Sequence, residues 1–170
     1  MRLFALVLTA FATAAMASDL PTLEELGTIA GRFHDAVKSA GMDLSKPLPQ
    51  VFIRNRPGLS VYHPKENEIT FPDWHSLTEE ARVRFAETGA SLGEPIGGER
   101  YFSETFRYFF VHELCHWVQS QELRIDDISK IDDPYGIEFQ ANQCAIGFWE
   151  AAEPVSVSYT HLTLPTSDLV

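Results

Sequence analysis

The sequence predicts a single α+β domain in which helices outnumber strands. Apolar residues recur at helical spacing in several long segments, and short stretches between turn signals alternate apolar with polar residues. The chain has 170 residues, of which 45% are hydrophobic. That is enough apolar material for one packed core and too little length for two comfortable domains.

The two ends of the chain differ from the middle. Residues 1–17 (MRLFALVLTAFATAAMA) combine one basic residue, an apolar stretch and small residues before Ala17, which is the pattern of a secretory signal peptide. The apolar stretch is too short for a stable membrane span. Residues 155–170 (VSVSYTHLTLPTSDLV) resemble a translated sequencing-adapter tail. We therefore expect an exported protein, periplasmic or secreted, with a folded domain over residues 18–154 and a non-native tail after it.

The charge of the chain argues against some classes of partner. Thirteen Lys and Arg residues face 24 Asp and Glu residues, for a formal net charge of −11. A protein that neutralises phosphates needs a basic surplus. Nucleic acids and anionic membranes are therefore not expected partners.

The first half of the domain predicts one helix and a small sheet. Thr22 and Glu25 form a capping-box pattern that opens an amphipathic helix ending at Gly41. Alternating segments follow on both sides of the Pro57-Gly58 turn, and residues 60–63 and 68–71 read as a hairpin with a four-residue connection. We expect the sheet to be antiparallel.

The second half predicts three helices. A moderate candidate covers residues 76–86, and a Gly-rich stretch over residues 89–98 reads as a mobile surface loop. The next helix, over about residues 103–121, is apolar nearly all round and therefore belongs in the centre of the molecule. A final helix opens at Pro134, with Asp133 as its cap, and runs to about Ala152.

The central helix contains the sequence H-E-L-C-H. His112 and His116 are four residues apart, so both imidazoles lie on one face of the helix and can bind one metal ion. Glu113 is rotated by about 100° from His112, where its carboxylate can accept a proton from water. The alternative is a pair of hydrogen-bonded core histidines without a metal, which would need other partners in so apolar a helix.

A catalytic zinc ion commonly takes three protein ligands. The best third donor is Glu138, near the start of the last helix, which the preceding linker allows to fold back across the central helix. Asn142 lies one turn further on the same face and is expected to accept a hydrogen bond from a zinc histidine. Ala141 and Ala145 are small enough to permit close packing of the two helices.

Cys115 and Cys144 lie on these same two helices, and export would allow them to pair. Each also lies in an apolar setting, where a free cysteine packs as a small hydrophobic residue. The sequence leaves both states open.

The segments VHELCHWV and EFQAN resemble the gluzincin metallopeptidases, the thermolysin-like group in which a Glu on the next helix completes an H-E-x-x-H zinc site. Gln119 and Glu122 replace the glycine and histidine that metzincins require. The resemblance implies a zincin-like fold, with a sheet edge that pairs with an extended peptide. In the family an Asp often follows the zinc Glu by four residues, where this chain has Asn142.

We therefore expect an exported zinc metallopeptidase that hydrolyses peptide bonds, with Zn²⁺ on His112, His116 and Glu138 and with Glu113 as general base. Its partner would be a peptide or protein substrate. The alternatives are a non-catalytic metal-binding protein, an inactive truncated remnant, and a metal-free helical interaction module.

Overall fold

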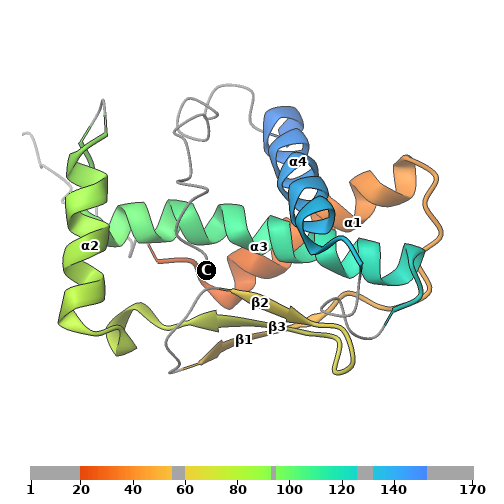
Figure 1. Cartoon of the computed structure of the whole chain (residues 1–170), viewed down its shortest axis with the longest axis horizontal. Coiled ribbons are helices and arrows are strands. Elements are labelled where there is room, and N and C mark those ends of the chain that lie inside the picture. Colours follow the sequence, from red (N-terminus) through yellow and green to blue (C-terminus); the bar gives the residue numbers. More distant parts are fainter. Residues whose placement is uncertain (1–19, 55–59, 93–94, 126–131, 153–170) are drawn as a thin grey trace, which may run out of the picture.

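The computed structural model describes residues 20–54, 60–92, 95–125 and 132–152. These residues form an α+β fold (Figure 1) with the elements α1 (Leu23–Ser39), β1 (Gln50–Arg54), β2 (Val61–His63), β3 (Glu68–Pro72), the 3₁₀ turn η1 (Trp74–Ser76), α2 (Glu79–Ala90), α3 (Gly98–Glu122) and α4 (Pro134–Ala152). The predicted signal peptide and the predicted non-native tail lie outside the described residues.

Helix α3 is the centre of the molecule, as its apolar sequence predicts. It runs along the long axis in Figure 1, with the sheet on one side, α1 and α4 on others, and α2 across its N-terminal end. Phe106, Phe110, Leu114 and Trp117 on α3 are almost completely buried. No helix within the described ranges has both the length and the hydrophobicity for a membrane span.

Helix α1 begins as predicted. The Thr22 hydroxyl accepts a hydrogen bond from Glu25 N at 3.1 Å, which satisfies one of the free amides of the first turn. Leu26 and Phe33 then bury against the shared core. Glu25 also binds Arg107 of α3 through an ion pair of 2.5 Å, so the two helices are joined by apolar and charged contacts.

The sheet is mixed, so the prediction of an antiparallel sheet is wrong for one of its two strand pairs. Strands β2 and β3 form the predicted hairpin, connected by residues 64–67. Strand β1, however, pairs parallel with β3, and the order is β1-β3-β2. Ile69 and Phe71 of β3 are buried together with Thr70 between them, and a strand buried on both faces is best satisfied in the middle of a sheet.

The predicted helix over residues 76–86 is displaced along the chain. The segment begins as the turn η1, and α2 starts only after Thr78, whose hydroxyl accepts a hydrogen bond from Ala81 N at 3.2 Å. The Gly-rich stretch is also shorter than predicted, because Gly89 lies inside α2 and Gly98 opens α3. A Cβ at Gly98 would lie 2.8 Å from Ala86 N, so glycine lets the two helices approach closely here.

Helix α4 has the predicted bounds, Pro134–Ala152. Asp133 Oδ1 accepts a hydrogen bond from Gly136 N at 2.9 Å and caps the first turn, as expected. Ala141 and Ala145 are fully buried. Their small side chains allow α4 to cross close to α3.

Candidate metal centre

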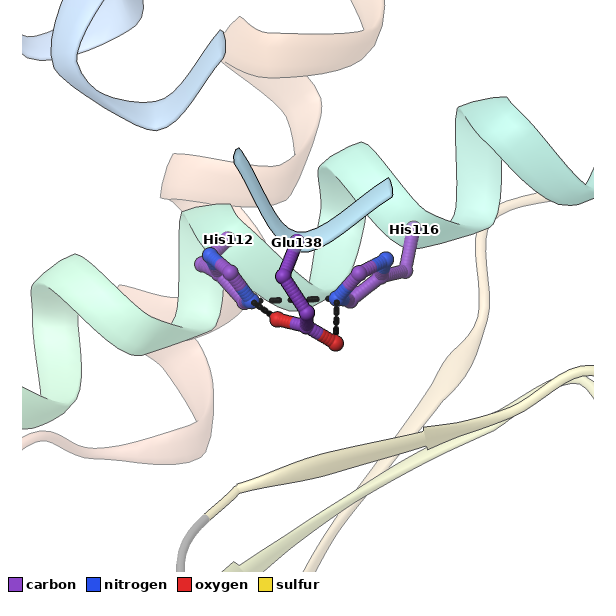
Figure 2. Close-up of side chains that lie close together, drawn as sticks. All are labelled: His112, His116 and Glu138. Carbon is purple, nitrogen blue, oxygen red and sulfur yellow. Dashed lines mark hydrogen bonds and ion pairs between the residues drawn. The ribbon is translucent and has the colours of Figure 1, made fainter. Parts of the chain in front are cut away.

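Three side chains from α3 and α4 converge on one point (Figure 2). His112 and His116 lie one turn apart on α3, and Glu138 reaches them from α4. One ligand atom from each of the three residues lies within 4.8 Å of the other two. The structure therefore brings together the three residues that the sequence predicts as ligands.

The separations between these atoms suit a small divalent ion. The two histidine Nε2 atoms are 3.0 Å apart, His112 Nε2 lies 3.1 Å from Glu138 Oε2, and His116 Nε2 lies 3.3 Å from Glu138 Oε1. Ligand atoms on a tetrahedral zinc ion, at about 2.1 Å from the metal, are about 3.4 Å apart. Two imidazoles and one carboxylate are also a donor set that zinc commonly takes. The residues present thus fit the ion that the resemblance implies.

The three donors differ in their exposure. Both histidines are only 5% exposed, whereas the Glu138 side chain is 56% exposed. The imidazoles therefore form the inner side of the site, and the carboxylate borders solvent. A metal ion bound here would be reachable from the side of α4.

The charges of the site are coupled in the absence of a metal. Hydrogen bonds from His112 and His116 lower the pKa of Glu138 well below its usual range, against a smaller opposing effect of burial. Burial lowers the pKa of His116, but the hydrogen bond to Glu138 and the nearby carboxylates outweigh it and raise the pKa overall. A metal ion would replace the shared protons, so its binding would release protons.

Glu113 lies beside the ligand cluster, between α3 and the sheet. It is 7% exposed, and its Oε2 accepts a hydrogen bond from Tyr62 N of β2 at 2.7 Å. Burial raises the pKa of Glu113 to about 7, although the His116 charge and the Tyr62 amide act in the opposite direction. A buried carboxyl group of this kind is typical of functional sites.

Gln119 is a part of the site that sequence reasoning missed. Its Oε1 lies 2.8 Å from His116 Nδ1, and its Nε2 donates to the Ile137 carbonyl at 3.0 Å. The spacing of three residues from His116 on one helix is a signal that could have found the first contact. The second contact joins α3 to α4, and no local sequence pattern predicts it.

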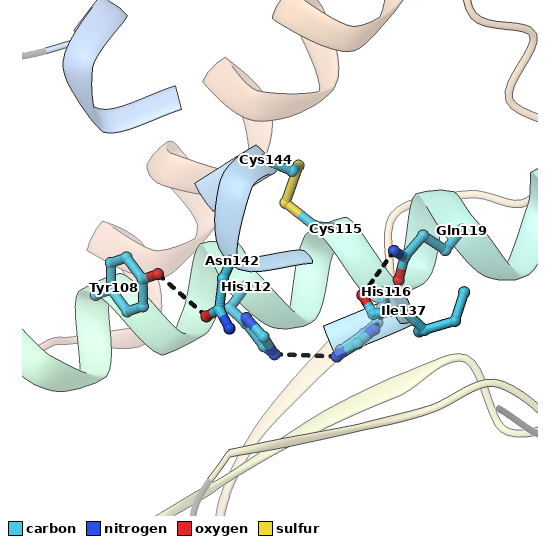
Figure 3. The surroundings of a disulfide bond; sticks show 8 residues. All are labelled: Tyr108, His112, Cys115, His116, Gln119, Ile137, Asn142 and Cys144. Carbon is cyan, nitrogen blue, oxygen red and sulfur yellow. Dashed lines mark hydrogen bonds between the residues drawn. A yellow bond between two sulfur atoms is a disulfide. The ribbon is translucent and has the colours of Figure 1, made fainter. Parts of the chain in front are cut away.

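Asn142 does not make the hydrogen bond that was expected of it. Its Oδ1 accepts from the Tyr108 hydroxyl at 3.2 Å rather than from a ligand histidine. His112 Nδ1 is buried and has no hydrogen-bond partner among the described residues. The physical reason is competition, because Tyr108 lies one turn before His112 on α3 and its hydroxyl reaches the amide (Figure 3).

Cys115 and Cys144 form a disulfide, which the sequence left open. Their Cα atoms are 6.2 Å apart. Cys115 directly precedes His116, and Cys144 lies on the helix that carries Glu138 (Figure 3). The bond therefore ties together the two helices that supply the metal ligands.

The other histidines of the described residues lie outside the ligand cluster. His63 Nε2 is within 3.1 Å of the Thr70 hydroxyl, outside the ligand cluster. His34 lies near Trp117 and His75 is exposed. His161 falls outside the described residues.

Comparison with known proteins identifies no relative. No family model, no curated protein and no solved structure matches the chain. Its chemistry is therefore inferred from the geometry of the site.

Proposed function

We propose that this chain is an exported zinc-dependent peptidase with a zincin-like domain. The observation that carries the proposal is the convergence of His112, His116 and Glu138 within 4.8 Å, with the buried carboxyl group of Glu113 next to them. The three ligands come from two helices that a disulfide and two buried alanines hold together.

In this proposal His112 Nε2, His116 Nε2 and one oxygen of Glu138 would hold the ion. When bound there, zinc would supply the Lewis acidity that acidifies a water molecule and polarises a substrate carbonyl. The two imidazoles are buried, which favours a defined ligand geometry. The exposed side of Glu138 leaves access for water and substrate.

Glu113 acts as the general base. Its Oε2 is held by the Tyr62 amide, so the carboxylate has a fixed orientation between α3 and β2. Its Oε1 is then the oxygen that receives the proton from the attacking water. A pKa near neutrality suits this task, because a base works best when its pKa is close to the working pH.

Two further features support a peptide substrate and an exported protein. Strand β2 is at one edge of the sheet and lies beside Glu113, and edge strands bind extended peptides by strand addition. The Cys115–Cys144 disulfide is typical of proteins that work outside the reducing cytosol.

The test compares the wild-type chain with Glu113→Gln and with His112→Ala. Glutamine keeps an acceptor for the Tyr62 amide but cannot take a proton. We expect E113Q to bind stoichiometric zinc and to lose roughly 100- to 10,000-fold in the rate of peptide hydrolysis. H112A should lose both zinc and activity. Zinc content is measured by elemental analysis and hydrolysis with a mixed peptide library.

The outcomes separate the alternatives. Wild-type protein that binds zinc but cleaves no peptide would point to a metal-binding protein without turnover. An E113Q variant with full activity would show that Glu113 is not the base. Wild-type protein without zinc would remove the proposal altogether.

A further inference from the structure

Gln119 joins a ligand histidine to the helix of the third ligand. It lies one turn after His116 on α3, and its side chain is 8% exposed (Figure 3). Oε1 lies 2.8 Å from His116 Nδ1, and Nε2 lies 3.0 Å from the carbonyl oxygen of Ile137. Ile137 directly precedes Glu138 on α4.

The contact with Ile137 determines which way the amide group faces. The two ends of a glutamine amide look alike, so their assignment follows from their partners. A backbone carbonyl can only accept a hydrogen bond, so the NH₂ group of Gln119 must face Ile137. The amide oxygen must then face His116.

The amide oxygen in turn determines the position of the proton on a neutral His116. An amide oxygen can only accept, so His116 Nδ1 must carry hydrogen and donate it. Once the Nε2 hydrogen that His116 shares with Glu138 in the absence of a metal is lost, the imidazole is neutral and Nε2 has a free lone pair. Nε2 is the atom that lies 3.0 Å from His112 Nε2 and 3.3 Å from Glu138 Oε1, so the lone pair is directed at the ligand cluster.

No comparable constraint acts on His112. Its buried Nδ1 has no partner among the described residues. The amide of Asn142 accepts a hydrogen bond from the Tyr108 hydroxyl through Oδ1 and makes no hydrogen bond to His112. Of the two ligand histidines, only His116 has its ring hydrogen assigned by hydrogen bonds among the described residues, from Nδ1 to Gln119 and from Gln119 to the Ile137 carbonyl.

We propose that Gln119 is a positioning residue for the metal site: it holds His116 in the tautomer that presents Nε2 to the ion and anchors this ring to the start of α4 beside Glu138. The inference rests on the proposed metal site but not on peptidase activity. It predicts that the two hydrogen bonds of Gln119 have separate effects.

Two substitutions separate these effects. Gln119→Glu keeps an acceptor for His116 Nδ1–H but cannot donate to the Ile137 carbonyl. Gln119→Met has a similar length and makes neither bond. The matched control is Gln121→Met on the same helix, because Gln121 is partly buried and also bonds to the backbone, at Lys46 N and at the Trp117 carbonyl, but does not touch the ligands.

The first readout is nitrogen NMR of the histidine side chains in full-length, metal-free protein, at a pH where His116 is neutral. We expect the Nδ1–H tautomer in wild type, in Q119E and in Q121M, and a mixture of tautomers in Q119M. The second readout is the zinc dissociation constant, measured by competition with a chelator. Loss of a group that orients a ligand typically costs ten- to a hundredfold in metal affinity. We expect a loss of that size in Q119M, a smaller loss in Q119E and none in Q121M.

The outcomes distinguish this inference from the proposed function. An Nε2–H tautomer at His116 in the wild type would overturn the role of Gln119 even if zinc binds. Wild-type affinity in Q119M, or an equal loss in Q121M, would overturn it as well. Wild-type protein that has the Nδ1–H tautomer but binds no zinc would instead remove the proposed function on which the inference rests.

Discussion

At the scale of single residues, burial of the charged carboxylate of Glu113 destabilises the folded protein. It is 7% exposed in a site whose other carboxylate, Glu138, already pairs with both histidines. Burial disfavours its charged form. A group retained at such a cost is better explained by chemistry than by packing.

This cost predicts how stability changes with pH in the metal-free protein. The pKa of Glu113 is raised from 4.5 to about 7, so the folded state binds this proton more tightly than the unfolded state does. Its contribution to the free energy of unfolding therefore falls as pH rises from about 4.5 to about 7, by roughly 3 kcal/mol at most. We expect E113Q to match wild type at pH 4 and to be more stable by up to that amount at pH 8. Urea denaturation in the presence of chelator measures both.

Glu138 has the opposite effect on the pH dependence of stability. Its pKa is lower in the folded state than in the unfolded chain, so it stabilises the fold at pH values above the ordinary pKa of a glutamate, and this stabilisation is lost on acidification. Both proteins retain Glu138, so the difference between them reports the removal of the Glu113 carboxyl group. Glu122→Gln on the exposed end of the same helix is the control and should show no such difference. Equal stabilities of E113Q and wild type at pH 8 would contradict the buried, costly carboxylate.

At the scale of elements, the metal centre depends on how α4 crosses α3. Cys115 and Cys144 connect the two helices, and Cys115 is next to His116. We expect the double variant C115A/C144A to lose roughly 3 kcal/mol of unfolding free energy, since a bond across 29 residues constrains the unfolded chain. We also expect weaker zinc binding, because Glu138 is then held by packing and hydrogen bonds alone. Calorimetry and chelator competition measure these changes.

Chemical reduction provides the control for this variant. A reductant should lower the stability and zinc affinity of wild type towards the values of C115A/C144A and should leave the variant unchanged. An unchanged zinc affinity in both would show that α3 and α4 meet correctly without the disulfide.

Helices were more predictable from the sequence than the sheet. The bounds of α4 follow from Asp133 and Pro134, and the start of α1 follows from Thr22, because caps act within one turn. The ligand pair on α3 follows from helical geometry alone. Glu138 was predicted because the linker before α4 allows this helix to fold back across α3.

The order of the strands depends on contacts that no short segment encodes. Pairing β1 with β3 places the most buried strand in the centre of the sheet. This pairing depends on how the whole core packs and not on the residues between β1 and β2. The same holds for Gln119, since its bond to Ile137 exists only once α4 is in place. Asn142 was assigned to a histidine because the competing Tyr108 hydroxyl is 34 residues away in the sequence.

At the scale of the whole molecule, the candidate metal centre lies where the main elements meet. Helix α3 supplies two ligands and contacts α1, α2, α4 and β2, while Glu113 extends the site to the sheet. An ion bound here would bridge α3 and α4 in the folded state, and the unfolded chain has no such arrangement. Zinc should therefore stabilise the fold as a unit.

This argument predicts a melting temperature that depends on zinc. At a free zinc concentration 100 times the dissociation constant, binding adds about 2.7 kcal/mol to the free energy of unfolding. For a domain of this size we expect an upward shift of about 5–10 °C in differential scanning calorimetry, reversed by chelator. H112A should show no shift, because one of the two buried imidazoles is gone. H75A is the matched control and should shift like wild type, since His75 is exposed and outside the cluster. A melting temperature that ignores zinc and chelator in wild type would mean that the convergence of His112, His116 and Glu138 is a packed polar cluster within a helical module and not a metal centre.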